Sequence, residues 1–150
     1  MGAEDAGEGL RAVEGDPREL AAVVVQEPGR ETDPPSRCHV HEGARPEYAG
    51  EVPDLSQYDT IFIGAPAWWG DWPMICYTFF ENHADAFAGK TLVPFSTHEG
   101  SGLSGFDKKL AKACPDAAVE KGLAVRGNDC QNRQDSVRED VAGWLEELGY

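Results

Sequence analysis

The sequence predicts an α/β fold with a parallel sheet, because strand and helix signals alternate along the central part of the chain. Residues 59–64 (DTIFIG) form a short apolar run closed by a glycine, as is typical of a buried strand. Residues 91–96 (TLVPFS) form a second such run. Each run leads directly into a loop. Because ligands bind beyond the carboxyl ends of the strands in open α/β sheets, these two loops are the candidate functional segments.

The two loops differ in composition. Residues 65–73 (APAWWGDWP), called here the aromatic loop, hold three of the four tryptophans, together with prolines and a glycine that prevent the strand from continuing. These tryptophans are Trp68, Trp69 and Trp72. Residues 97–105 (THEGSGLSG), called here the glycine-rich loop, are small and polar. Glycine allows backbone amides to come close to a flat ligand.

The first fifty residues carry weaker signals. Residues 10–20 are compatible with a ragged helix, although Gly15 and Pro17 interrupt it. Residues 20–26 (LAAVVVQ) are the only good strand candidate before Asp59. The segment that follows, EPGRETDPPSR, has the composition of a loop.

Three helices and one more strand region are expected after residue 72. Proline is favoured in a first helical turn, so Pro73 should open a helix that runs to about His83. A second helix should start at Ser104 or Gly105 and end near Ala113. Its apolar residues Phe106 and Leu110 should face the sheet, while Lys108, Lys109 and Lys112 face solvent.

The C-terminal part should complete the sheet and add an amphipathic helix. Residues 117–126 are the last strand region, interrupted near Gly122. The final helix is expected over residues 134–148 and should end at Gly149. Its buried stripe should consist of Val137, Val141, Trp144, Leu145 and Leu148.

Composition limits the possible partners. The 150 residues suffice for one domain with its own core. The sequence has 27 acidic and 13 basic residues, which gives a net charge of −14. This charge argues against nucleic acid and anionic membrane as partners. The charge suits docking to basic-surfaced proteins, and solubility alone explains it equally well. No apolar run approaches the roughly 20 residues that span a bilayer, and the acidic N-terminus does not resemble a signal peptide.

The four cysteines are widely spaced and form no CxxC pair. We therefore expect neither a metal site nor a disulfide framework, and we expect reduced thiols in the cytoplasm. Cys38, His39 and His41 are metal-ligand residue types, but they lie in the least structured segment, and no metal site is assigned to them.

Three stretches of the chain resemble the bacterial flavodoxins, which are small FMN-binding electron carriers. They are YDTIFIGAPAWWGDWPM, GKTLVPFSTHEGSGLSG and GLAVRG. The resemblance covers about two thirds of the chain and implies a three-layer sandwich, with helices on both faces of a parallel sheet. On this basis we divide the chain into an irregular acidic N-terminal segment, residues 1–44, and a flavodoxin-like domain, residues 45–150.

The resemblance implies one FMN between the two loops. The cofactor-binding residues would be Pro66, Trp68, Trp69, Gly70, Thr97, His98, Gly100, Ser101 and Gly102. An indole stacks well on a flat apolar ring, and Trp68 is the first choice for this contact. For Trp69 we favour a place in the core. For His98 we favour a hydrogen bond that anchors its loop over catalysis. No catalytic constellation is found, and whether the protein is an enzyme stays open.

The family's phosphate-binding loop, of the form T-x-T-G-x-T, is not found in this sequence. The segment after residues 20–26 has one threonine and carboxylates that would repel a phosphate. The better alignment makes residues 21–26 the family's second strand and residues 10–20 a remnant of its first helix. The first strand would then be missing or replaced. An incorrect gene start, or a frame error upstream, explains such a chain equally well.

The missing strand has a structural consequence. In the 2-1-3-4-5 strand order of this fold, the first strand pairs with the second and the third. Its loss would expose an edge at residues 59–64. Residues 21–26 moved inward would cover that edge. A strand from another chain would also cover it, which predicts a homo-oligomer.

Two main functions remain from the sequence. The first is a flavodoxin-like FMN-binding electron-transfer protein with basic-surfaced redox partners. FMN binding would be weak without the phosphate loop. The alternative is a flavodoxin-fold remnant or interaction module that no longer binds FMN. A quinone reductase of the same fold ranks below both, since the sequence offers no nicotinamide-binding fingerprint.

Overall fold

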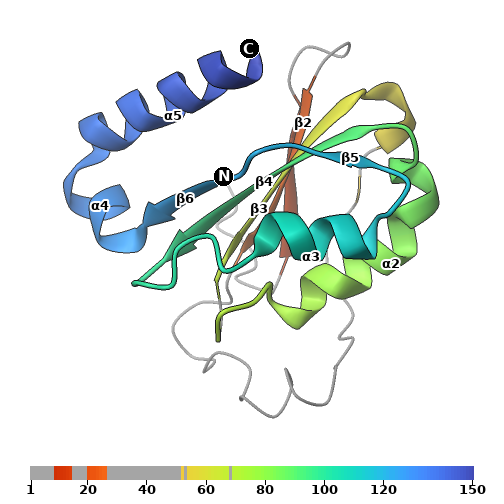
Figure 1. The fold of residues 1–150 in the computed structure, drawn as a ribbon, viewed down its shortest axis with the longest axis horizontal. Helices are drawn as coiled ribbons and strands as arrows, with labels where there is room; N and C mark the ends of the chain where they lie inside the picture. Colours follow the sequence, from red (N-terminus) through yellow and green to blue (C-terminus); the bar gives the residue numbers. More distant parts are fainter. Residues whose placement is uncertain (1–8, 15–19, 27–51, 53, 68) are drawn as a thin grey trace, which may run out of the picture.

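The computed structural model describes residues 9–14, 20–26, 52, 54–67 and 69–150, the first two ranges through their backbone. Six described strands form one sheet in the order β1-β2-β3-β4-β5, with β6 also paired to β4 (Figure 1). The strands are β1 (Gly9–Glu14), β2 (Leu20–Gln26), β3 (Thr60–Pro66), β4 (Thr91–His98), β5 (Ala118–Val119) and β6 (Leu123–Arg126). From β2 onward all neighbours are parallel, so β3 and β4 end at the same edge.

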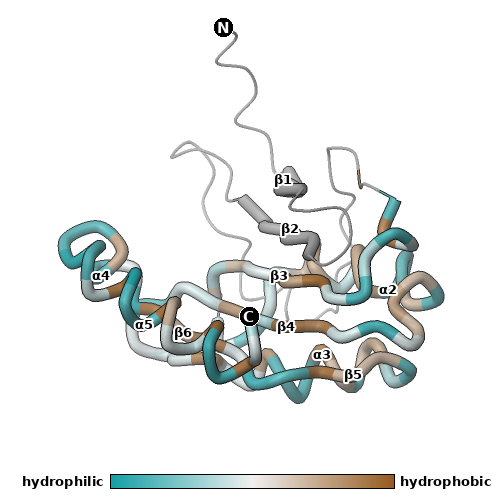
Figure 2. The backbone as a smooth tube through the Cα atoms, turned by 90° about the horizontal axis from the view of Figure 1, so that it is seen from above, coloured by the Kyte–Doolittle hydropathy of each residue, from teal (hydrophilic) through white to brown (hydrophobic). Residues whose placement is uncertain are grey.

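Both faces of the sheet carry helices, which confirms the predicted α/β class. Helices α2 (Met74–Phe87) and α3 (Phe106–Ala113) cover one face, and α5 (Gln134–Leu148) packs on the other. Side chains alternate between the faces of a strand. Ile61 and Ile63 accordingly join the core under α2 and α3, whereas Phe62 packs against Trp144 of α5. Figure 2 shows hydrophobic residues along β3 and β4, between the helices.

The N-terminal strands correct one prediction and confirm another. The ragged helix expected over residues 10–20 is wrong, because β1 forms there and pairs antiparallel with β2. Gly15 and Pro17, which weaken a helix, are also residue types typical of turns. The strand predicted over residues 20–26 is confirmed as β2.

β2 lies beside β3 and pairs with it in parallel, from Leu20 opposite Thr60 to Val24 opposite Gly64. Residues 21–26 thus occupy the place next to β3 that the missing first strand would have filled, which is one of the two arrangements expected from the sequence. The edge of β3 is therefore covered by the same chain. The exposed edge that motivated the homo-oligomer is closed here, and the oligomer itself stays a prediction.

Pro94 explains why the last strand region is split into β5 and β6. β4 pairs with β5 at Thr91 and Leu92, and with β6 from Phe95 onward. The Pro94 carbonyl faces this side of β4, since its oxygen lies 2.9 Å from the position of a Cβ on Gly122. The N–H and C=O of one strand residue point to the same side of the strand. Because Pro94 has no N–H, it cannot donate a hydrogen bond to a strand that pairs with β4 at this position. The predicted interruption near Gly122 is confirmed.

The helices agree with prediction except at their ends. Helix α2 runs one turn further than expected, to Phe87, and the predicted second helix is α3. The short α4 (Gly127–Asn132) and the 3-10 helix η1 (Leu55–Gln57) were not predicted. Helix α5 has the predicted bounds, and Gly149 ends it with a φ of 90°.

The predicted apolar stripe of α5 is only partly buried. Trp144 is buried, and Leu145 and Leu148 pack against it beside the sheet. Val137 and Val141, earlier in the helix, remain half-exposed. Only the second half of α5 therefore contributes strongly to the core. No helix in the described part of the chain combines the length and the apolarity needed to cross a bilayer.

Candidate functional site

The aromatic and glycine-rich loops begin side by side. Pro66, the last residue of β3, lies opposite Thr97 in β4. The N–H of Ala67 donates to the carbonyl oxygen of Thr97 at 2.8 Å, which extends the ladder one step past the strand. The structure thus brings Pro66 and Thr97, two of the predicted site residues, together at the carboxyl edge of the sheet.

The aromatic loop turns sharply after residue 68, which lies outside the described residues. Trp69 and Gly70 both have left-handed backbone conformations, with φ of 55° and 73°. This conformation costs roughly 1–3 kcal/mol for a residue other than glycine, so the surroundings must hold Trp69 in place. The Trp69 side chain is 52% exposed. The preference for Trp69 as a core residue is therefore wrong.

Trp72 takes the core position instead. It is fully buried, and its ring stacks on Phe106 of α3 with centroids 3.8 Å apart. Its indole Nε1 donates to the carbonyl oxygen of Phe106 at 3.1 Å, so the polar end of the ring is also satisfied. An edge-on contact with Phe80 completes its surroundings. Trp72 anchors the C-terminal end of the aromatic loop to α3.

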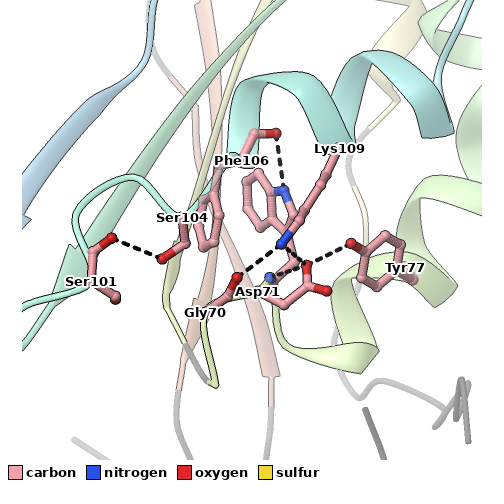
Figure 3. A network of polar contacts seen from close by, with 8 residues as sticks. Gly70, Asp71, Tyr77, Ser101, Ser104, Phe106 and Lys109 are labelled. Atoms are coloured by element: carbon pink, nitrogen blue, oxygen red, sulfur yellow. Dashed lines mark hydrogen bonds and ion pairs between the residues drawn. The ribbon is translucent and has the colours of Figure 1, made fainter. Parts of the chain in front are cut away.

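A polar network on Asp71 holds the turn of the aromatic loop (Figure 3). Asp71 Oδ1 accepts hydrogen bonds from the Trp72 backbone N–H at 2.7 Å and the Tyr77 hydroxyl at 2.6 Å. Lys109 Nζ lies 3.2 Å from the same oxygen and donates to the Gly70 carbonyl at 2.8 Å. Lys109, which was expected to face solvent, does so only in part, because its side chain is 34% exposed and its ammonium is held by the aromatic loop. Its neighbour Lys108 is exposed as expected, and Phe106 and Leu110 are buried.

The glycine-rich loop is folded back on itself. The N–H of Gly100 donates to His98 Nδ1 at 3.0 Å, which agrees with a loop-anchoring role for His98. The Ser104 hydroxyl donates to the Ser101 carbonyl at 3.3 Å, and the Ser96 hydroxyl donates to the Gly102 carbonyl at 3.4 Å. Gly100 and Gly102 have φ of 147° and 65°. Only glycine adopts such values without strain at both positions.

Helix α4 lies beside the glycine-rich loop in space. A Cβ added at Gly127, the first residue of α4, would overlap the Glu99 carboxylate. Glu99 therefore packs against the start of α4. Gly127 leaves the room that this contact requires.

The described cysteines show no sign of catalytic chemistry. Cys76 and Cys114 are buried, and Cys130 is half-buried. Burial, and secondarily the Asp71 carboxylate, raise the pKa of the Cys76 thiol well above its ordinary value. Burial also raises the pKa of Cys114, to about 11. Both thiols stay protonated and inert at neutral pH. The described residues contain no group of three or more ligand-type side chains that could hold a metal ion, and the Cys38–His41 segment lies outside them.

A cleft of about 490 Å³ lies elsewhere, between β6 and the helices α4 and α5. No predicted cofactor-binding residue lines it. Ion pairs occupy its rim, Lys121 with Glu147 at 2.7 Å and Arg133 with Asp129 at 3.9 Å. The cleft offers paired charges, whereas the two loops offer the exposed Trp69 ring and open space beside Gly70, Gly100 and Gly102, so we assign the candidate site to the loops.

Among the solved structures that are similar to this chain are two from Bacteroides species. One is a protein of Bacteroides uniformis provisionally described as a flavoprotein, with 36% identity over 63% of this chain and 62% of that chain, and a TM-score of 0.51. The other is from Bacteroides eggerthii, is described in the same way, and has 34% identity, coverage of 63% and 60%, and a TM-score of 0.52. The chain thus spans about three fifths of the length of each. The comparison with curated proteins finds no match.

The family comparison agrees with the fold. Residues 33–148 match the model of the family described as flavodoxin. This range covers more than half of the chain and includes both loops and the helices on both faces of the sheet. Together with the parallel sheet and the two loops at its carboxyl edge, the match shows that this chain belongs to the flavodoxin family.

Proposed function

We propose that this chain is a flavin-binding electron-transfer protein, which holds one FMN between the aromatic loop and the glycine-rich loop. Its family membership and the description of its two solved relatives support a flavin. The observation that carries the proposal is the exposed Trp69 indole, held beside a second loop whose backbone is open to a flat ligand.

The described residues fit a planar ring system. A Cβ added at Gly70, Gly100 or Gly102 would meet no heavy atom within 4 Å, so open space adjoins the backbone at all three positions. Backbone groups there can approach the edge of a ring. Trp69 offers an aromatic surface for stacking, with few rotatable bonds to immobilise. When bound, a flavin supplies the chemistry of accepting and releasing electrons.

The chain's own residues would bind and orient the ring. Hydrogen bonds within the glycine-rich loop hold its backbone in place, and preorganisation of this kind lowers the cost of binding. The indole of Trp69 would shield one side of the ring from water. Pro66 and Thr97 pair with each other at the ends of β3 and β4, and they would lie at the base of the space between the two loops.

Binding should depend mostly on the ring. The sequence contains no T-x-T-G-x-T loop. A hydrogen bond to a charged group contributes about 1.5–3 kcal/mol, and each 1.4 kcal/mol is about tenfold in affinity. A flavodoxin without these phosphate contacts therefore distinguishes FMN poorly from riboflavin. We expect similar dissociation constants for the two, in the micromolar range or weaker.

The partners we propose are basic-surfaced redox proteins. The net charge of −14 would attract them by long-range electrostatic steering, which increases association rates at low ionic strength. The widely spaced cysteines fit a reducing compartment, and we propose the cytoplasm.

Titration of the purified protein with FMN, and in parallel with riboflavin, tests the proposal through quenching of flavin fluorescence. Comparable binding of both would support a ring-only site. The substitution Trp69→Ala should then weaken binding of both, while Trp69→Phe keeps part of the affinity. Tight FMN binding with weak riboflavin binding would contradict the absence of a phosphate site.

The alternative is a flavodoxin-fold interaction module that no longer binds FMN. The missing T-x-T-G-x-T sequence is the observation that favours it. If neither flavin binds, the electron-transfer proposal fails for this chain and the alternative takes its place.

A further inference from the structure

Helix α3 is connected to both loops of the candidate site. It begins directly after Gly105, the last residue of the glycine-rich loop, which caps the helix with a φ of 70°. Its first residue, Phe106, stacks on Trp72 and accepts the indole hydrogen bond at 3.1 Å. One turn later, Lys109 reaches the turn of the aromatic loop. A single short helix thus carries contacts to both walls of the proposed flavin site.

The contacts of Lys109 are directed at the strained part of the aromatic loop. Its Nζ donates to the Gly70 carbonyl at 2.8 Å and pairs with Asp71 Oδ1 at 3.2 Å (Figure 3). The side chains of Lys109 and Asp71 are 34% and 21% exposed, so water screens this pair less than a fully exposed one. The ammonium therefore holds two consecutive residues of the loop from one point on α3.

The held residues directly follow Trp69. A tryptophan in the left-handed conformation relaxes to ordinary backbone angles unless its surroundings prevent it. The Lys109 contact to the Gly70 carbonyl fixes the Gly70–Asp71 peptide, which is the second peptide after Trp69. The Trp72–Phe106 stack holds the loop three residues after Trp69 through a separate, apolar contact.

We infer that Lys109 is a positioning residue of the flavin site: from α3 it clamps the aromatic loop at Gly70 and Asp71, and so keeps the Trp69 indole at a set distance from the glycine-rich loop. The inference rests on the proposed function for its effect on flavin binding. The clamp itself is a property of the loop and can be measured without flavin.

The test compares Lys109→Met with Lys108→Met. Both substitutions remove one positive charge from α3 and keep an unbranched side chain, and Lys108 is exposed on the same helix. Circular dichroism checks that each variant is folded. Lys109→Arg serves as the conservative variant, because a guanidinium can donate to both oxygens.

The first readout is cleavage by chymotrypsin after Trp69, followed by mass spectrometry of the apo protein. A released loop should be cut at the Trp69–Gly70 bond about fivefold faster in Lys109→Met than in Lys108→Met, since cleavage requires local opening. Lys109→Arg should restore the slow rate. Equal cleavage rates in Lys109→Met and Lys108→Met would overturn the clamp.

The second readout is the dissociation constant for riboflavin. We expect Lys109→Met to weaken riboflavin binding about fivefold, because a loosened loop must be ordered again on binding. Lys108→Met should weaken it less than twofold. Unchanged riboflavin affinity in a variant that is cut faster would overturn the role of Lys109 in flavin binding. Absence of flavin binding by the unsubstituted protein would contradict the proposed function only, because the cleavage rate tests the clamp by itself.

Discussion

Trp72 and Phe106 stack nearly parallel, at an interplanar angle of 16° and a centroid distance of 3.8 Å, although 34 residues separate them in the chain. The same pair is joined by the hydrogen bond from the indole Nε1 to the Phe106 carbonyl. This contact fixes the aromatic loop to α3 through buried apolar surface. It differs in kind from the partly exposed Lys109 clamp.

Trp72 should therefore be essential for stability. Removing a buried aromatic side chain costs about 3–5 kcal/mol, so Trp72→Ala should lower the free energy of unfolding by that amount. Trp72→Phe keeps a ring and loses the hydrogen bond, and should cost less, about 1–3 kcal/mol. Urea denaturation measures both values. Trp69→Ala is the matched control, and a loss for it as large as for Trp72→Ala would contradict the assignment of the two tryptophans.

Gly64 in β3 should not tolerate a side chain. A Cβ at this position would overlap the ring of Phe95 in the neighbouring strand β4. Overpacking of this kind costs about 1–3 kcal/mol, which Gly64→Ala should show in denaturation. Adding Phe95→Leu should recover part of the loss. Additive losses in the double variant would show that the ring is not the obstacle.

Thiol accessibility should separate the cysteines. In a Cys38→Ser background three cysteines remain, and Cys76 and Cys114 are buried, with raised pKa values. A chromogenic disulfide reagent at pH 8 should therefore label Cys130 alone in the native protein, and all three thiols in guanidinium. Rapid labelling of a second native thiol would contradict the packing around α2 or α3.

Stability should fall as the pH falls through about 6.5, partly because of His83. Burial lowers the pKa of His83 below its ordinary value of 6.5. The unfolded chain then binds more protons than the folded one between the two pKa values, so stability is present above 6.5 and decreases toward lower pH. One proton contributes at most about 1.4 kcal/mol per pH unit, and solvent screening of the partly exposed His83 keeps its contribution below that limit.

The contribution of His83 to the free energy of unfolding is measured by denaturation at pH 8 and at pH 5.5. Both the unsubstituted protein and His83→Gln are compared at the two pH values. The variant should lose less stability between the two values than the unsubstituted protein. Identical pH dependences would show that His83 titrates normally in the folded state.

Local sequence signals predicted most of the elements and placed the two loops at one edge of the sheet. Five elements were predicted within a few residues of their observed bounds, namely β3, β4, α2, α3 and α5. Their signals, which include apolar periodicity, Pro73 and Gly149, are local in the sequence. The two loops were expected at one edge because parallel strands end together. Even the break near Gly122 was visible in the sequence.

The remaining features depend on contacts between residues far apart in the chain, so they could not be predicted from local sequence signals. Residues 9–14 form a strand because β2 pairs with them, whereas isolated propensity allowed a helix. Trp69 and Trp72 stand close together in the sequence, yet only Trp72 of these two meets Phe106, 34 residues after it, and is buried. Lys109 looks like its exposed neighbours until the Gly70 carbonyl, 39 residues earlier, comes within 2.8 Å of its ammonium.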